Sequence, residues 1–307
     1  MIPSPINTDR VFGTHTPFAL RVHQAKPQES FDLRQGSVAR HGFKWKPPES
    51  CPPTKGPLPV SSSANLTLSG NALLAALPQA ALAGLQFSHL ALPQGEVCFY
   101  AGDLIQRVYF PTTGLISLVV STDKGELIEA GMVGRQGAAG VQSALGQRFS
   151  FPRAIVQIPG TFYVVSAEAL RRGVAASEEA KALVQQYIET LWAEAQQICA
   201  CNAAHEGAMR LARWLLQCAD RTGTEQLTLT QEFLGEMLGI SRTRVTLLAQ
   251  QLQDRGIIKY SRGKIAIVDR AALESCACEC YRTIKGLYGE LAARTQKQFS
   301  GSTLSVR

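Results

Sequence analysis

The stretch that decides the fold runs from Leu227 to Val268 and reads LTLTQEFLGEMLGISRTRVTLLAQQLQDRGIIKYSRGKIAIV. Its first part has apolar residues at helical spacing behind Thr230, which is placed to cap a helix. Gly239 then lets the chain turn sharply, because a residue with positive φ is needed where one helix ends against the next. Ser241 is placed to cap a second helix. The pattern therefore predicts a helix, a tight turn and a second helix.

The second helix is expected to have one buried side and one exposed side. Val245, Leu248 and Leu252 recur at i, i+3 and i+7, which is the spacing of a single apolar face. Polar side chains are left around the exposed N-terminal turns, the part of a recognition helix that reads base edges in the major groove. The residues predicted to contact DNA on this helix are Ser241, Arg242, Thr243, Arg244 and Thr246.

A basic hairpin is expected after the second helix. Two β-rich runs, residues 257–260 and 265–267, flank a turn that carries Arg262 and Lys264. Such a wing is suited to contact with phosphate, so both residues join the predicted DNA contacts. A winged helix can also serve protein contacts, and this stretch alone leaves that alternative open.

Upstream of this motif, residues 177–203 read as one long helix. Ser177 is a plausible N-cap, and the acidic residues that follow it complement the helix dipole. Apolar residues recur at spacings of 4, 3, 4 and 3, the a/d seam of a coiled coil, which predicts pairing with a second copy of the chain. The alternative is an amphipathic helix that faces the chain's own core. The predicted dimer-interface residues are Val184, Ile188, Leu191, Ala195 and Ile198.

The region before the long helix has a different residue pattern. Residues 65–176 contain short runs rich in Val, Ile, Phe and Tyr, separated by turn residues at close and regular spacing. This cadence predicts an antiparallel barrel or sandwich, and its turns are typical of a double-stranded β-roll. Residues 1–64 hold ten of the fifteen prolines and show no apolar period, so they are expected to be disordered.

The predicted fold class is therefore α+β. It combines an N-terminal double-stranded β-roll, a long dimerisation helix and a C-terminal winged helix-turn-helix over residues 204–275, followed by a helix and tail over residues 276–307. The charge distribution agrees, since residues 66–203 carry 8 basic and 10 acidic side chains, whereas residues 204–270 carry 10 and 7. A basic C-terminal region favours a nucleic-acid partner.

Several functional classes are disfavoured by what the sequence lacks. No apolar run approaches the roughly 18 residues of a membrane span, and no secretory signal opens the chain, so a cytoplasmic protein without membrane contact is expected. Eight cysteines are too few for a disulfide scaffold of this size, which predicts free thiols. No nucleophile elbow, phosphate-binding GK[ST] loop or paired-carboxylate motif is present, so the protein is not expected to be an enzyme.

Residues 70–270 resemble the CRP/FNR superfamily of bacterial transcription regulators. The resemblance rests on the β-roll turns, the long helix, the run Arg210-Leu211-Ala212-x-x-Leu215-Leu216, and the G-x-S-R-x-x-V turn from Gly239 to Val245. It implies a sequence-specific homodimer on double-stranded DNA, an effector-sensing N-terminal domain, and RNA polymerase as a partner. The alternative is a non-DNA ligand-binding or adaptor protein built on the same β-roll.

The resemblance also assigns roles to single residues of the second helix. Arg242 aligns with the family's base-contacting arginine, directly after the capping serine. Thr243 stands where many members carry glutamate, and Leu247 stands where some carry another arginine. The target sequence is therefore expected to differ from the usual one of the family.

The sensor pocket departs further from the family pattern. Cyclic-nucleotide-binding members present Gly-Glu and, several residues later, Arg-Ser, but here Arg135 occupies the glutamate position and Pro152-Arg153 replaces Arg-Ser. No cofactor is expected and cyclic AMP is disfavoured, which leaves another small effector or none. The effector-pocket residues implied by the resemblance are Gly134, Arg135, Gly137 and Arg153.

The cysteines near the C-terminus raise the question of a metal. If residues 276–280 form one helix, Cys276 and Cys280 share a face while Cys278 points away, so one helix cannot wrap all three around an ion. The pair Cys199 and Cys201 has the same problem. The sequence therefore predicts structural or incidental thiols and no metal site. His205 is interpreted as a surface or capping residue, with haem ligation as the alternative.

Overall fold

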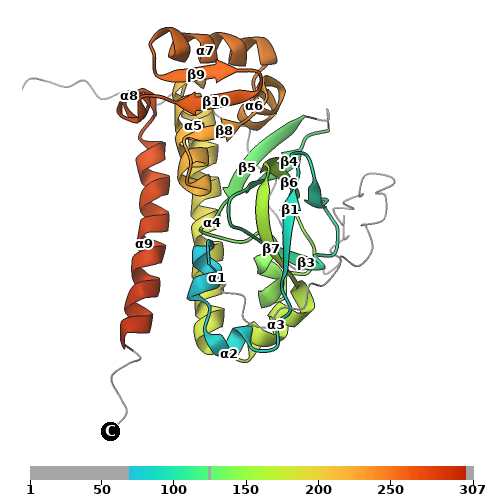
Figure 1. Ribbon diagram of the computed structural model, residues 1–307. Helices are drawn as coiled ribbons and strands as arrows, with labels where there is room; N and C mark the ends of the chain where they lie inside the picture. Colours follow the sequence, from blue (N-terminus) through green and yellow to red (C-terminus); the bar gives the residue numbers. More distant parts are fainter. Residues whose placement is uncertain (1–68, 124–125, 302–307) are drawn as a thin grey trace, which may run out of the picture. The chain divides into compact units, whose positions relative to one another are not determined.

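The computed structural model describes residues 69–123 and 126–301, without the side chains of residues 231–232 and 296–301. The disorder predicted for residues 1–64 lies outside the described residues. The mixture of helices and strands is the one that the predicted fold class requires (Figure 1). In the described part of the chain, no helix is both long and apolar enough to span a bilayer.

The N-terminal domain is built from two antiparallel sheets, with strand orders β1-β7-β3 and β2-β6-β4-β5. The turn at residues 101–103 shows why the chain folds back so tightly: Gly102 has a φ of 83°, and Asp103 Oδ2 accepts a hydrogen bond from Tyr100 N at 3.0 Å. The strands are β1 (Ser88–Leu92), β2 (Val97–Phe99), β3 (Arg107–Pro111), β4 (Leu115–Ser121), β5 (Leu127–Val133), β6 (Arg153–Ile158) and β7 (Gly160–Ser166).

Short helices accompany these sheets and lead into a long one. Leu73, Leu74 and Leu170 place helices before and after the sheets in one buried cluster with the strands. The N-cap predicted at Ser177 is confirmed, because its side chain accepts from Ala180 N at 3.2 Å. The helices are α1 (Ala72–Ala76), α2 (Gln79–Leu82), η1 (Val141–Leu145), α3 (Ala167–Ala175) and α4 (Glu178–Ala204).

The C-terminal region contains the predicted helix-turn-helix and wing. The wing strands pair in register from Lys264–Ser261 to Ile267–Ile258, and a further strand completes a sheet of order β8-β10-β9. The elements are α5 (Gly207–Thr222), β8 (Gln226–Thr228), α6 (Gln231–Leu238), α7 (Arg242–Asp254), β9 (Ile258–Ser261) and β10 (Lys264–Ile267).

The segment with the clustered cysteines is not a single helix, contrary to the sequence-based interpretation. Helix α8 (Arg270–Cys276) ends before the Cys278 position, and α9 (Cys280–Gly301) begins after it. The chain changes direction between them, and α9 runs beside α4 (Figure 1). Side chains of the linking residues therefore do not follow helical spacing, which removes the geometric argument against a shared site.

One hydrophobic cluster joins the β2-β6-β4-β5 sheet to the C-terminal domain. Val119 and Met132 of the sheet belong to the same fully buried cluster as Trp214 and Leu215 of α5. Glu129 of β5 is buried in this contact. The N-terminal domain and the helix-turn-helix therefore share a packed core.

The buried carboxyl group of Glu129 is held by hydrogen bonds from both sides of that contact. Trp214 Nε1 donates to Glu129 Oε1 at 2.8 Å, and Ser117 Oγ donates to Oε2 at 2.5 Å. Burial raises the pKa of Glu129 from 4.5 to about 7, although both hydrogen bonds act in the opposite direction. The junction of the two domains thus contains a group that titrates near neutral pH.

Candidate nucleic-acid interface

The turn between α6 and α7 has the geometry that the sequence predicts. Thr230 and Ser241 cap the two helices by accepting from the amides of Phe233 and Arg244, each at 3.3 Å. Gly239 has a φ of 62° and ends α6 in the left-handed conformation. These caps hold the first turn of α7 in place without using its outward side chains.

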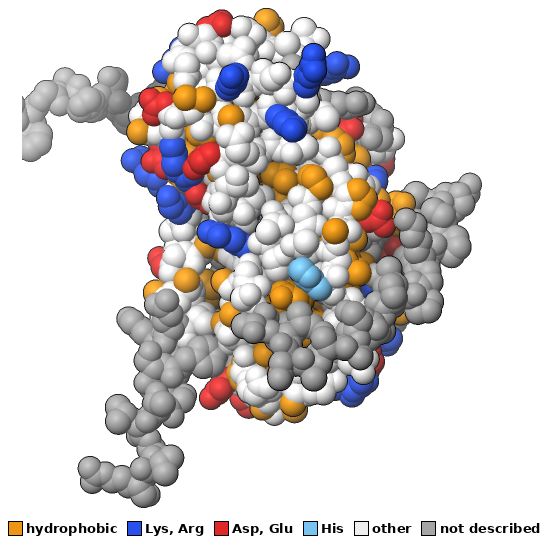
Figure 2. Space-filling model, viewed as in Figure 1, with side chains coloured by type: hydrophobic (Ala, Val, Ile, Leu, Met, Phe, Trp, Pro, Cys, Tyr) orange, Lys and Arg blue, Asp and Glu red, His pale blue; other side chains and the backbone are white. Residues whose placement is uncertain are grey.

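The DNA contacts predicted on α7 all lie on its exposed side. Val245, Leu248 and Leu252 are buried, with 0%, 5% and 5% of their surface exposed, and so fix which way the helix faces. We call the outward side the recognition face, and its residues are Arg242, Thr243, Arg244, Thr246 and Leu247. Figure 2 shows Lys and Arg side chains over the end of the molecule that carries α7 and the wing.

Charge on this side is not neutralised within the protein. Arg242 and Arg244 form no salt bridge with any residue that the structure describes, and the same holds for Arg262 and Lys264. The hydroxyl of Thr246 already donates a hydrogen bond within the helix, to the Arg242 carbonyl oxygen at 3.0 Å. The exposed guanidinium groups are therefore available to an external anion.

The wing is a tight basic turn. Arg262 has a φ of 46° and Gly263 one of 75°, and two consecutive residues with positive φ are typical of a type I′ hairpin turn. The side chains of Arg262 and Lys264 are both exposed. The predicted hairpin is confirmed by its strand pairing, whereas its contact with DNA stays a prediction.

Sequence reasoning missed one member of the recognition face. Leu247 is 56% exposed, which is unusual for a leucine, and lies among the polar residues of α7. In the sequence it stands out only as a departure from the family pattern. The signal that could have found it is its absence from the apolar period formed by Val245, Leu248 and Leu252. An exposed aliphatic side chain there can contact a thymine methyl group.

Two of the predicted effector-pocket residues have a packing role. A Cβ atom at Gly137 would lie 2.0 Å from Tyr187 Oη, and one at Gly134 would lie 2.5 Å from Arg221 Cβ. Tyr187 of α4 also accepts a hydrogen bond from Ala138 N at 3.1 Å. Both glycines are thus needed for the close approach of α4 and α5, a reason that requires no ligand.

The two arginines of the predicted pocket do not line the same cavity. Arg135 lines a cavity of about 520 Å³ together with residues of α1, α5 and α9, among them Arg221 and Lys285. Arg153 is not among the lining residues, and its guanidinium lies over the Tyr100 ring, 5.4 Å from the ring centroid. The prediction that Arg135 and Arg153 form one pocket is corrected accordingly.

The residues of the predicted dimer seam are largely buried against other parts of the same chain. Val184 and Ile198 are only 0% and 4% exposed, and Ile188 and Leu191 pack against the chain's own core. Ala195 is half-buried. The outward stripe of α4 is displaced by one residue, because the β-roll and α9 cover the predicted face. Its members are Gln185, Glu189, Trp192, Gln196 and Cys199.

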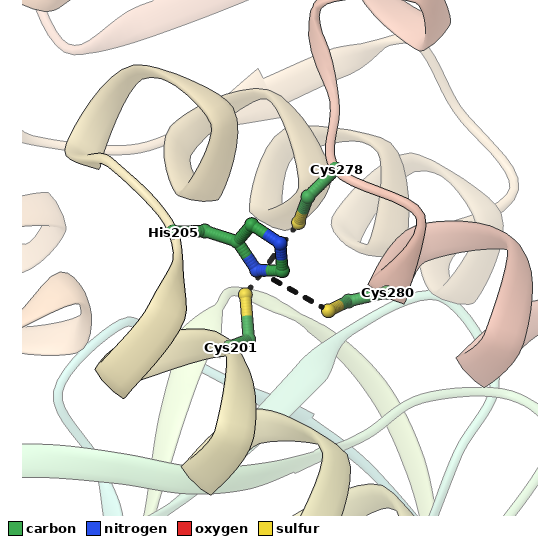
Figure 3. A group of neighbouring side chains, drawn as sticks. All are labelled: Cys201, His205, Cys278 and Cys280. Carbon is green, nitrogen blue, oxygen red and sulfur yellow. Dashed lines mark hydrogen bonds between the residues drawn. The ribbon is translucent and has the colours of Figure 1, made fainter. Parts of the chain in front are cut away.

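Four side chains from two distant segments converge beside the start of α5. We call them the Cys/His cluster: Cys201 and His205 at the end of α4, and Cys278 and Cys280 at the junction of α8 and α9. Their potential ligand atoms all lie within 4.8 Å of one another (Figure 3). His205 also caps α4, as predicted, through its backbone N–H to the Cys201 carbonyl oxygen at 3.0 Å. Cys276 and Cys199 lie outside the cluster, in agreement with the prediction that neither cysteine run surrounds an ion alone. The meeting of Cys278 and Cys280 with Cys201 and His205 is what the sequence did not indicate.

Comparison with known proteins supports the assignment of the C-terminal region. Residues 209–276 match the family described as the Crp-like helix-turn-helix domain. The Global nitrogen regulator of Synechococcus elongatus is 24% identical over 189 residues, which cover 59% of this chain and 85% of that protein. The Global nitrogen regulator of a Nostoc species is 24% identical over 184 residues, or 57% and 82% of the two chains.

Solved structures share the fold. FixK2 from Bradyrhizobium japonicum superposes with a TM-score of 0.55 at 15% identity, over 62% of this chain and 98% of that one. A CRP-family transcriptional regulator from Thermus thermophilus gives a TM-score of 0.52 at 21% identity, over 61% and 96%. Residues 209–276 therefore form a Crp-like helix-turn-helix domain, and these solved regulators share the fold of the matched part of the chain.

Proposed function

We propose that the chain is a transcription regulator of the CRP/FNR type that binds double-stranded DNA sequence-specifically as a homodimer, with the recognition face in the major groove. The observation that carries the proposal is the pair Arg242 and Arg244, exposed at the N-terminal end of α7 and without an ion-pair partner among the described residues. A helix N-terminus also favours anionic groups, so this end of α7 suits the phosphate-lined groove.

Each part of the surface has a distinct role in this proposal. Arg242 reads guanine through O6 and N7, and Leu247 contacts a thymine methyl group. Arg262 and Lys264 bind phosphate from the wing, which fixes the register of the helix without reading sequence. Contact with RNA polymerase at the bound operator would then couple DNA binding to transcription.

The proposal is tested by fluorescence anisotropy of the full chain on two labelled duplexes of equal length. One carries the region upstream of the protein's own gene, and the other carries the same bases in scrambled order. At a fixed physiological salt concentration, we expect a preference of roughly a thousandfold or more for the first duplex. Equal affinity for both, with strong salt dependence, would mean that the surface binds DNA without reading it.

The homodimer is proposed to form through the exposed stripe of α4. Trp192 is 67% exposed at the centre of this stripe, and large aromatic side chains are enriched at the centres of interfaces. In a symmetric pair, Trp192→Asp would bury two unpaired carboxylates, which costs several kcal/mol. Sedimentation at micromolar concentration should therefore show monomers. Val268→Asp, at another exposed apolar residue, is the matched control and should leave the dimer intact.

The effector is proposed to be a small anion that binds in the cavity beside Arg135. The cavity is within the size range of small-molecule sites, and Arg135 lies against Gly223 at the end of α5, where a Cβ atom would be 2.6 Å from its Nη1. Native mass spectrometry of the purified dimer should reveal the bound compound. Arg135→Ala should lose it and Arg153→Ala should keep it, whereas the opposite result would place the site near Tyr100.

A further inference from the structure

The Cys/His cluster has the composition and spacing of a metal site. Cys201 Sγ and Cys278 Sγ are 3.5 Å apart, and Cys280 Sγ is 3.6 Å from His205 Nδ1. For a zinc ion with Zn–S distances of about 2.3 Å in a tetrahedron, neighbouring sulfur atoms would be separated by about 3.8 Å. The observed separations thus require only small adjustments to place all four ligands around one ion.

We propose that the Cys/His cluster binds one zinc ion with tetrahedral Cys₃His coordination. Thiolate and imidazole ligands select a soft or borderline divalent cation over Mg²⁺ or Ca²⁺, which prefer oxygen. In an iron–sulfur cluster, the ligating sulfur atoms bind different irons and lie further apart than these do. Four protein ligands leave no open position, which is the pattern of a structural site.

The surrounding residues hold the ligands as they do around known metal sites. His205 Nε2 lies 3.1 Å from Glu279 Oε1, so Nδ1 is the nitrogen left to face the thiols. A carboxylate on the second nitrogen of a ligating histidine fixes its tautomer and raises its basicity. Gln197, one turn before Cys201, donates from Nε2 to Cys280 Sγ at 3.1 Å. Both outer contacts come from the segments that supply the ligands.

The cluster is also placed to be neutralised electrostatically. Three thiolates and one Zn²⁺ ion carry a net charge of −1. Arg210 of α5 is close enough to Cys201 and Cys278 for their charges to interact. Its guanidinium Nη2 donates to the Leu238 carbonyl oxygen at the end of α6, and its Nε is buried without a hydrogen-bond partner among the described residues. Arg210 therefore links the cluster to the helix-turn-helix.

The proposed ion would fasten three elements at the base of the DNA-binding domain. Cys201 and His205 end α4, while Cys278 and Cys280 stand where α8 gives way to α9. Cys201 and Cys278 are 77 positions apart, and the segment between them includes the whole helix-turn-helix and wing. Closing this loop with a metal fixes the orientation of α5 relative to α4, and hence the position of the recognition face.

The metal content of the full chain tests the proposal. Protein purified from cells grown with zinc should contain about one zinc per chain by plasma mass spectrometry. Cys278→Ser combined with Cys280→Ser should reduce the content at least tenfold. Cys199→Ser and Cys276→Ser are matched controls, because both cysteines lie within two residues of ligands but outside the cluster. Both control proteins should keep their zinc.

A spectroscopic measurement on the wild-type chain tests the proposal even if the double variant fails to fold. Replacement of zinc by Co²⁺ in the wild-type chain should give thiolate-to-cobalt charge-transfer bands and the visible bands of tetrahedral cobalt. His205→Cys should retain a tetrahedral spectrum with stronger charge transfer. The proposal is overturned if wild-type protein takes up neither ion, if it contains iron and sulfide, or if Cys201 and Cys278 form a disulfide.

Discussion

The C-terminal half of the molecule contains two groups of polar side chains with opposite arrangements. The recognition face on α7 spreads its arginines outward, each exposed and without an ion-pair partner among the described residues. The Cys/His cluster draws its four side chains inward, and its cysteines are at most 2% exposed. Divergent charges suit an extended anion such as DNA, whereas convergent buried ligands suit a single ion.

The difference also separates what each group does for the fold. Side chains that point into solvent contribute little to folding, so the recognition face can be altered without loss of structure. The Cys/His cluster joins the end of α4 to the start of α9, and its cysteines are part of a buried apolar cluster with Met209. We therefore expect changes in the cluster to affect stability and DNA binding together, and changes in the face to affect DNA binding alone.

Removing the metal should have the largest effect on stability. Structural zinc contributes about 10–16 kcal/mol of binding energy in small zinc domains, and part of this is folding energy. Cys278→Ser, or prolonged chelation of the wild type, is expected to lower the Tm by roughly 10 °C or more and to weaken DNA binding. Differential scanning calorimetry with and without chelator measures the shift. An unchanged Tm after complete metal removal would mean that the cluster does not support the fold.

Arg242→Ala should have the next largest effect, and only on DNA. Loss of a bidentate contact to guanine is expected to cost about 1–3 kcal/mol per half-site and to relax specificity at one base pair in each half. Its Tm should equal that of the wild type, in contrast to Cys278→Ser. Anisotropy titrations on the operator and on its single-base variants measure both the loss of affinity and the loss of specificity. A loss that is uniform over all sequences would make Arg242 a phosphate contact, and Thr243, Arg244 or Thr246 would then carry the readout.

Glu129→Gln should change how stability depends on pH, although Glu129 belongs to neither the recognition face nor the Cys/His cluster. The pKa of Glu129 is about 7 in the folded protein, against an ordinary value of 4.5, so the folded chain binds more protons than the unfolded chain between these values. This carboxyl group therefore lowers stability progressively as pH rises from about 4.5 to 7, by at most about 3 kcal/mol. The variant should show a smaller decline over that range in urea unfolding. A parallel decline in both proteins would refute the shifted pKa.

Lys264→Ala should produce the smallest effect of the series. Its exposed wing position predicts a phosphate contact, whose loss weakens binding evenly across sequences and lowers the salt slope by about one per contact. Affinities measured at several salt concentrations separate this result from that of Arg242→Ala. If Lys264→Ala instead alters the preferred sequence, the wing reads bases, and the division of roles between helix and wing is wrong.

The helix-turn-helix could be predicted because its determinants are local. The caps at Thr230 and Ser241 and the turn at Gly239 act within a few residues, so the sequence contains the complete pattern. The Cys/His cluster depends on a break in the helix and a change of chain direction between Cys276 and Cys280, which helical spacing does not reveal. It also depends on the packing of α9 along α4. A contact between residues 77 positions apart has no local signature.

Two further positions show how packing changes a correct local interpretation. The long helix was expected, but the choice of its outward face failed at Val184, because one residue of displacement rotates a helix by about 100°. Gly137 was retained from a ligand-binding pattern, whereas its structural requirement is the approach of Tyr187. The sequence pattern of α4 is compatible with two outward faces, and a glycine at position 137 is compatible with ligand binding or with close packing. In each case the element packed against the residue decides between the two.

Selection of binding sites from a random pool of duplex DNA tests the central claim, sequence-specific reading by α7, most directly. The full-length wild-type chain should enrich a near-palindromic sequence whose half-sites are about one helical turn apart. The same selection with Arg242→Ala should lose the preference at one base pair in each half. A wild-type protein that enriches no sequence, or an Arg242→Ala variant that enriches the identical one, would contradict the proposal that the recognition face reads DNA.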